Sequence, residues 1–228
     1  DIVHAKTDMT PEVIEMTQTF LKNLSDMLPT ILIPGNHDAN LNNSSRLDAL
    51  SPIVNALNHR NLHYFKDDGA WNMGGLTFIH SSVFGDSKKI VPADDVDGDY
   101  KIGLYHGPVD RVKTEHGFAI SNKNVNVESF DGYDLVLLGD IHKRQFLNDD
   151  ETVAYPGSLI QQNFAEAPDH GFLLWDVEKR KSEFIQVEND YGFKAIRVED
   201  DEIKSKMNFV PRYGNLKIKH KGTSAEKL

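Results

Sequence analysis

The spacing of apolar residues changes along the chain, and the change separates predicted helices from predicted strands. After Thr10-Pro11-Glu12, apolar residues recur at near-helical spacing, and this hydroxyl, proline and acid together form a strong helix start. The pattern predicts one helix over 11–27 and a second over about 47–58. Shorter apolar runs predict strands at 30–34, 62–65, 70–73, 76–80, 100–105, 134–138, 171–177, 182–187 and 215–220.

The order of these elements predicts the fold class. Gly74-Gly75 joins two strand-like runs as a tight hairpin turn, and the charged tip 178–181 joins another two. Helices come early and hairpins come late, which favours an α/β fold with two packed sheets over a single parallel doubly wound sheet. The run at 215–220 alternates apolar and lysine residues, as an edge or half-buried strand does.

Composition sets the class of protein. The chain has 228 residues, 39% hydrophobic and 26% charged, which predicts one substantial core with a small appendage. Cysteine is absent, which removes disulfides, thiolate nucleophiles and cysteine zinc sites, and no apolar run reaches the roughly 18 residues of a membrane span. With no signal-like segment at the start, we expect a cytoplasmic protein that does not enter the membrane.

Charge is unevenly distributed. The net charge is -10, but seven basic residues and one acid lie within 203–228, so this segment carries +6 and the remainder -16. A strongly acidic chain is unlike a nonspecific nucleic-acid coat protein. The basic segment has two interpretations: it contacts phosphate, or it is a solvated edge strand.

Polar residues with metal-binding capacity follow several of the apolar runs. Gly35-Asn36-His37-Asp38 comes directly after the run at 30–34, at the kind of strand end where ligand sites collect in α/β folds. The runs at 100–105 and 134–138 are followed in the same way, and the chain opens with an acid and a histidine; the residues concerned are Asp1, His4, His106, Asp140 and His142. On an extended backbone, the side chains of Asp140 and His142 would point the same way. Any one such residue is ordinary in a capped turn, but together they predict a two-metal hydrolytic centre.

The order of these motifs is similar to that of the calcineurin-like metallophosphoesterase superfamily. Within it, the chain most resembles the DNA double-strand-break repair nuclease branch, which contains SbcD, its phage counterparts and the meiotic recombination 11 nuclease. His4, the segment 155–159 (Tyr-Pro-Gly-Ser-Leu) and the later hairpin with its basic segment carry this closer likeness. The resemblance implies a two-sheet β-sandwich core flanked by helices. It also implies a nuclease domain over 1–190 and the start of a small β-rich capping region over 191–228.

Two departures from the family pattern matter. The family's first strand, with its Asp-x-His pair, would precede Asp1, so we expect the chain to be truncated at its N-terminus. As given, it would supply a full ligand set for only one of two metals. Asp140 stands where the family usually has histidine, and a carboxylate is a competent ligand for a hard metal ion.

The resemblance assigns roles residue by residue. Two divalent ions, most simply Mn²⁺, would be held by Asp1, Asn36, His106, Asp140 and His142, with one site incomplete, and a water activated between them would attack phosphorus. His37 would act as general acid and stabilise the transition state, Asp38 would orient His37, and His4 would position the scissile phosphate. Arg46 is a candidate contact to a DNA phosphate.

The implied function is a manganese-dependent DNA exonuclease or endonuclease that acts on DNA ends in repair or recombination. Its expected partners are DNA, an SbcC-type SMC-like ATPase and a second copy of the chain, in the cytoplasm or, for a phage protein, the host-cell cytoplasm. Two alternatives stay open: a phosphomonoesterase or cyclic-nucleotide phosphodiesterase, and a non-catalytic scaffold with a degenerate metal site. The remaining histidines are interpreted as structural or surface residues: His59, His63, His80, His116, His170 and His220.

Overall fold

Sheets dominate the molecule. The computed structural model describes residues 1–4, 8–43, 46–85, 89–207 and 210–222. About 15% of the chain is helical and 32% is in strands, so the α/β class is confirmed, with the helices early as predicted. The helical elements are α1 (Pro11–Met27), α2 (Ser51–Leu57) and two short 3-10 turns, η1 (Ala93–Asp95) and η2 (Val127–Phe130).

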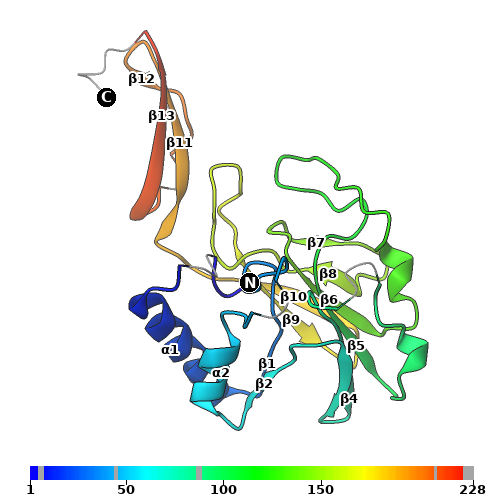
Figure 1. Cartoon of the computed structure of the whole chain (residues 1–228). Helices are drawn as coiled ribbons and strands as arrows, with labels where there is room; N and C mark the ends of the chain where they lie inside the picture. Colours follow the sequence, from blue (N-terminus) through cyan, green and yellow to red (C-terminus); the bar gives the residue numbers. More distant parts are fainter. Residues whose placement is uncertain (5–7, 44–45, 86–88, 208–209, 223–228) are drawn as a thin grey trace.

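The largest sheet has six strands in the order β3-β4-β5-β6-β8-β7 (Figure 1). Its four central strands run parallel, and an antiparallel strand closes each edge. Parallel strands place their carboxyl ends at the same edge of a sheet, so the loops that follow them meet there. The strands are β3 (Gly69–Met73), β4 (Leu76–Ser81), β5 (Lys101–His106), β6 (Leu135–Gly139), β7 (Gln145–Phe146) and β8 (Val153–Tyr155).

Both faces of this sheet are buried, which explains why its central strands read as continuous apolar runs. On β5, Ile102 and Leu104 face one hydrophobic cluster while Tyr105 faces another. On β6, Leu135 and Val136 divide in the same way.

Two smaller strand pairs contribute side chains to the cluster around Ile102. The pair β1 (Thr30–Leu32) and β2 (Leu62–Tyr64) is parallel, whereas β9 (Gly171–Asp176) and β10 (Lys181–Gln186) form the predicted hairpin with the charged tip. Side chains from both pairs pack there, including Ile31 and Trp175. The end of β1 is thereby held beside the main sheet.

The two helices differ in how well the sequence predicted them. α1 begins and ends where predicted, because Thr10 accepts a hydrogen bond from the Val13 amide and proline occupies the first helical position. α2 begins at Ser51, later than predicted. The buried Asp48 carboxylate instead accepts hydrogen bonds from the Leu50 and Ser51 amides, so it closes the start of the helix from outside.

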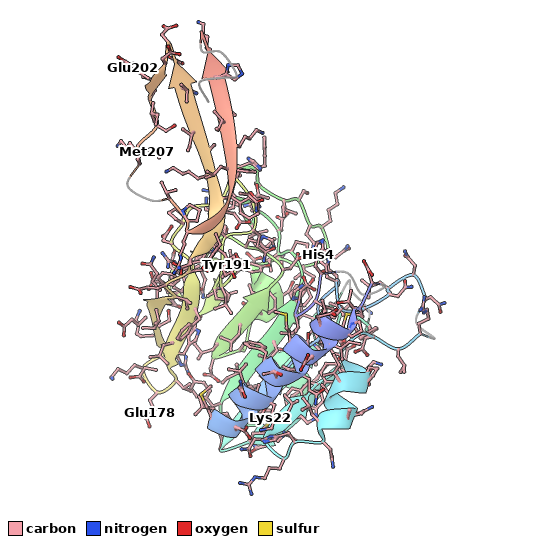
Figure 2. The ribbon with its side chains drawn as sticks, turned by 90° about the vertical axis from the view of Figure 1, so that its left-hand side faces the viewer. His4, Lys22, Glu178, Tyr191, Glu202 and Met207 are labelled. Carbon is pink, nitrogen blue, oxygen red and sulfur yellow. The ribbon has the colours of Figure 1, made fainter. Side chains whose placement is uncertain are left out.

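A three-stranded arm projects from the body (Figures 1 and 2). It comprises β11 (Tyr191–Glu199), β12 (Glu202–Ile203) and β13 (Tyr213–Lys221), in the order β12-β11-β13. β13 pairs with β11 in parallel, with Tyr191 opposite Tyr213, while β11 and β12 are joined through Asp200 and Asp201, both with positive φ. Figure 2 shows Tyr191 near the base of the arm and Glu202 near its far end.

The strand predicted at 215–220 lies within β13, at the edge of the arm sheet, with every residue of β13 exposed. The end of the predicted basic segment, 223–228, lies outside the described residues. The domain boundary at 190 stays a prediction. Within the described ranges, no helix has both the length and the apolar character needed to cross a membrane.

Candidate metal and phosphoester site

The loops at the carboxyl ends of β5 and β6 bring three of the predicted ligands together. His106 is the last residue of β5 and lies opposite Gly139, the last residue of β6. His106 Nε2 lies 3.3 Å from Asp1 Oδ2 and 3.9 Å from Asp140 Oδ1. Residues far apart in the sequence therefore meet at one ring nitrogen.

The loop after β1 holds Asp1 in place. The other carboxylate oxygen of Asp1 accepts a hydrogen bond of 2.8 Å from the His37 amide. A β-carbon at Gly35 would overlap this carboxylate, so the close approach requires glycine. Asn36 is half-buried in the same loop.

His106 has the properties of a metal ligand. Burial lowers the pKa of its imidazole to about 4, so the ring is neutral near pH 7, the form that binds metals. Its Nε2 atom is buried and has no hydrogen-bond partner among the described residues. A buried polar atom in that state, with two carboxylates beside it, is a position where a cation fits.

The hydrogen bonds of Asp38 give it a different role from the predicted one of orienting His37. Its side chain is fully buried and accepts hydrogen bonds from the backbone amides of Val3 (2.9 Å), Ile2 (3.0 Å) and Gly35 (2.9 Å). These amides surround the carboxylate because the first residues of the chain cross directly over the loop. Asp38 therefore fastens the first residues to the loop after β1.

His37 is held by His4 instead. Its Nδ1 atom lies 3.0 Å from the His4 carbonyl oxygen, and the two imidazole rings are stacked with centroids 4.7 Å apart. A carbonyl oxygen only accepts, so His37 Nδ1 carries the hydrogen. The Nε2 atom of His37 is then the ring nitrogen that can contact a ligand.

Asp140 and His142 do not project together from an extended strand, so that expectation is wrong. Asp140 has φ of 93°, a left-handed conformation that few non-glycine residues adopt. Strained backbone of this kind is concentrated at functional sites. The kink turns the Asp140 carboxylate toward His106, while His142 lies beyond it in the loop.

His142 has a partner that the sequence did not reveal. Its Nδ1 atom lies 3.0 Å from Oε1 of Glu166, a fully buried carboxylate in the loop between β8 and β9. His170, which was interpreted as structural or surface, is buried and lies 3.7 Å from the other oxygen of Glu166. No sequence motif or hydrophobic period marks Glu166. It lies 24 positions from His142 in the sequence, and only the fold brings the two side chains together.

The Pro-Gly-Ser segment, residues 156–158, contacts the loop that carries His142. The Ser158 amide donates to the His142 carbonyl (3.2 Å), and a β-carbon at Gly157 would lie 2.7 Å from that same oxygen. A cavity of about 150 Å³ opens beside His142, and Arg144 and Asp169 are among the residues that line it. Arg46 is exposed in the loop between β1 and α2.

The fit to a divalent cation rests on the donors around His106. Across the described ranges, no three His, Cys, Asp or Glu side chains are arranged as a metal centre. Asp1, His106 and Asp140 nevertheless converge on one buried nitrogen. Carboxylates with a neutral imidazole form a donor set suited to manganese, iron or zinc, so these residues match such an ion chemically.

Comparison with known proteins gives one clear relative and no family. No protein-family model matches the sequence. The chain is 43% identical over 225 residues to uncharacterized protein R555 of Acanthamoeba polyphaga mimivirus. The match covers 93% of this chain but only 16% of the relative, so the chain spans about a sixth of that protein's length.

Proposed function

We propose that this chain is the catalytic core of a metal-dependent phosphoesterase that hydrolyses phosphodiester bonds in DNA, of the metallophosphoesterase repair-nuclease type. The observation that carries the proposal is the convergence of Asp1 and Asp140 on the buried Nε2 of the neutral His106 ring, which has no hydrogen-bond partner among the described residues. Two packed sheets of the metallophosphoesterase kind are part of the proposal. The packing of Ile31 of β1 and Trp175 of β9 on one face of the main sheet supports it.

The residues divide the work between metal binding and proton transfer. Asp1, His106, Asp140 and Asn36 would hold one divalent ion, and His142 would contribute to a second. Bound divalent ions, most simply Mn²⁺, supply an activated water and neutralise charge on the phosphoryl group. Asp38 keeps the first residues of the chain against the loop that carries Asn36 and His37.

His37 is the proposed general acid. With its Nδ1 hydrogen donated to the His4 carbonyl, the ring can also donate from Nε2 only as an imidazolium. The His4 carbonyl oxygen holds the ring through Nδ1, and the stacked His4 ring fixes its plane. The proton then passes from Nε2 to the leaving oxygen as charge builds on it.

DNA, an SbcC-type ATPase and a second copy of the chain are the proposed partners. The exposed arm, with its lysine-rich β13, is a surface of the right charge for phosphate. Arg46, which lies in the same loop as His37, is a proposed contact to a DNA phosphate.

The test compares the unaltered chain with His37→Ala and with His116→Ala, a control at an exposed histidine in a turn that carries none of the proposed site residues. Each is incubated with end-labelled duplex and single-stranded DNA, in Mn²⁺ or in chelator, and Mn²⁺ binding is measured by calorimetry. We expect Mn²⁺-dependent cleavage that falls by about 100-fold or more in His37→Ala, with normal Mn²⁺ binding. The control should cleave normally.

Each contrary result has a distinct meaning. Equal turnover in His37→Ala would remove the proposed role of that residue. Hydrolysis of bis-p-nitrophenyl phosphate with no cleavage of DNA would instead assign the site to small phosphoesters. A chain with no Mn²⁺ affinity and no hydrolysis would be the non-catalytic scaffold.

A further inference from the structure

Glu166 is a buried carboxylate whose neighbours are mainly hydrogen-bonding nitrogen atoms. Its side chain is fully buried, and three nitrogen atoms lie within hydrogen-bond distance of its oxygens: His142 Nδ1 (3.0 Å) and Asn163 Nδ2 (2.6 Å) at Oε1, and the Gln162 amide (2.7 Å) at Oε2. His170 Nε2 lies farther away, 3.7 Å from Oε2. Burying a charge costs free energy unless hydrogen bonds compensate it. No lysine or arginine in the described chain forms an ion pair with it, so these contacts must do so.

The hydrogen bonds fix which nitrogen of His142 carries a proton. The Gln162 amide can only donate, and the Asn163 amide group also donates, because its own oxygen accepts from the Ala165 amide (2.9 Å). Both amides therefore use the Glu166 carboxylate as an acceptor, and we assign the third contact in the same sense, as a hydrogen bond that His142 donates from Nδ1. Nε2 of His142 then carries the lone pair, on the side of the ring away from Glu166.

The loop that carries Glu166 is itself anchored. The Glu166 carbonyl accepts from Gln161 Nε2 (2.8 Å), and Gln161 Oε1 accepts from the Phe193 amide on β11 (2.7 Å). Below, His170 is buried and bonded through Nδ1 to the Ser158 carbonyl (2.9 Å). Glu166 thus presents its carboxylate from a rigid position.

We propose that Glu166 is a positioning residue for metal binding, which locks His142 in the Nδ1–H tautomer and aims its Nε2 lone pair at a divalent cation. This inference rests on the proposed function, in which His142 is a ligand. A carboxylate behind a ligating histidine fixes ring orientation and raises its basicity, and loss of such a carboxylate typically costs 10- to 100-fold in metal affinity.

Glu166→Gln tests the proposal with little change in volume. The amide nitrogen would face either the Gln162 amide or the pair formed by Asn163 and His142, so one donor must oppose another. We expect Mn²⁺ affinity, measured by calorimetry, to fall by about 10-fold or more. The matched control Glu183→Gln, at an exposed glutamate on β10, should bind Mn²⁺ as the unaltered chain does.

A coupled measurement separates positioning from general damage. In His142→Ala, which has no ring to position, adding Glu166→Gln should cause little further loss of affinity. An equal loss in both backgrounds would overturn the proposal and assign Glu166 a purely structural role.

The tautomer is read directly by long-range ¹H–¹⁵N NMR of the metal-free protein. We expect the Nδ1–H form of His142 in the unaltered chain and a shift toward Nε2–H in Glu166→Gln. An unchanged tautomer in the variant would contradict the proposal. If the unaltered chain bound no Mn²⁺, the proposed function would fail and so would the metal half of this inference, while the NMR result would still decide whether Glu166 controls His142.

Discussion

Close approach of backbone to side chain decides the geometry of the candidate site at the scale of single residues. Gly139 ends β6 directly beside His106, and a β-carbon there would lie 2.7 Å from His106 Nδ1. That distance is shorter than any ordinary contact of a carbon atom, so His106 would have to move. The absence of a side chain at Gly139 is therefore a condition for the position of the proposed ligand.

Gly139→Ala is predicted to displace His106 and to weaken Mn²⁺ binding by about 10-fold or more. Calorimetric titration with Mn²⁺ measures this. Gly74→Ala is the control, since a β-carbon at Gly74 meets open space and its positive φ of 61° adds only backbone strain. Gly74→Ala should lower stability slightly and leave affinity unchanged. Normal affinity in Gly139→Ala would show that crowding at His106 does not reach its Nε2.

The buried ring of His80 gives the protein a pH dependence of its own. Burial lowers the pKa of His80 to about 4, below the ordinary value near 6.5 that the unfolded chain has. Between these values the unfolded chain binds the proton and the folded chain does not. The free energy of unfolding therefore falls as the pH drops from about 6.5 to 4, by up to about 3 kcal/mol from this residue.

His80→Asn should remove that component while keeping a donor toward the Asp67 carbonyl, which His80 Nδ1 approaches at 3.2 Å. Urea denaturation at pH 7.5, 5.5 and 4.5 compares the two chains. The unaltered chain should lose more stability on acidification than His80→Asn, and His116→Asn, at an exposed ring, should behave like the unaltered chain. Parallel losses in all three would exclude His80 as the source.

Residue types at strand ends predicted much of the candidate site, but not the partners within it. His106 and Asp140 converge with Asp1, as we expected from the position of the first two after strand-like runs and from the acid that opens the chain. The bonds of Asp38 to backbone amides and of His142 to Glu166 were beyond prediction. They depend on which segments cross in space, and a sequence pattern describes only neighbours along the chain.

At the scale of elements, caps explain both the successes and the errors. α1 carries its start signal in adjacent residues, so the sequence places it correctly. α2 begins late because Asp48 acts from outside the helix, held also by Tyr64 Oη (3.0 Å) and Lys66 Nζ (3.0 Å). Those two residues come from the strand region after the helix, so the tertiary fold sets the start of α2.

Asp48→Ala is predicted to lower the free energy of unfolding by about 3 kcal/mol, because it leaves several buried donors without an acceptor and unpairs Lys66. Chemical denaturation measures the change. Asp150→Ala, at an exposed turn residue, should stay within about 0.5 kcal/mol of the unaltered chain. A similarly small effect for Asp48→Ala would mean that water replaces the lost acceptor.

At the scale of the whole molecule, the chain has a body built on a sheet that is buried on both faces, and one arm projects from it (Figure 1). Because both faces of the main sheet are buried, its central strands could be predicted from apolar runs in the sequence. The α/β class could be predicted from the order of helices and strands along the chain. The arm was only partly predictable. Its edge strand shows alternation, but the parallel pairing of β13 with β11 joins segments whose separate patterns carry no sign of each other.

That parallel pairing predicts an order of events in folding. Every pair of register partners on β11 and β13 is 22 positions apart, as Tyr191 and Tyr213 are, so no short-range contact can start this ladder. β11 and β12 instead meet through a two-residue turn at Asp200 and Asp201, whose positive φ values suit the twist of a tight hairpin. We therefore expect the hairpin to form first in the arm and β13 to add to it in a later and slower step.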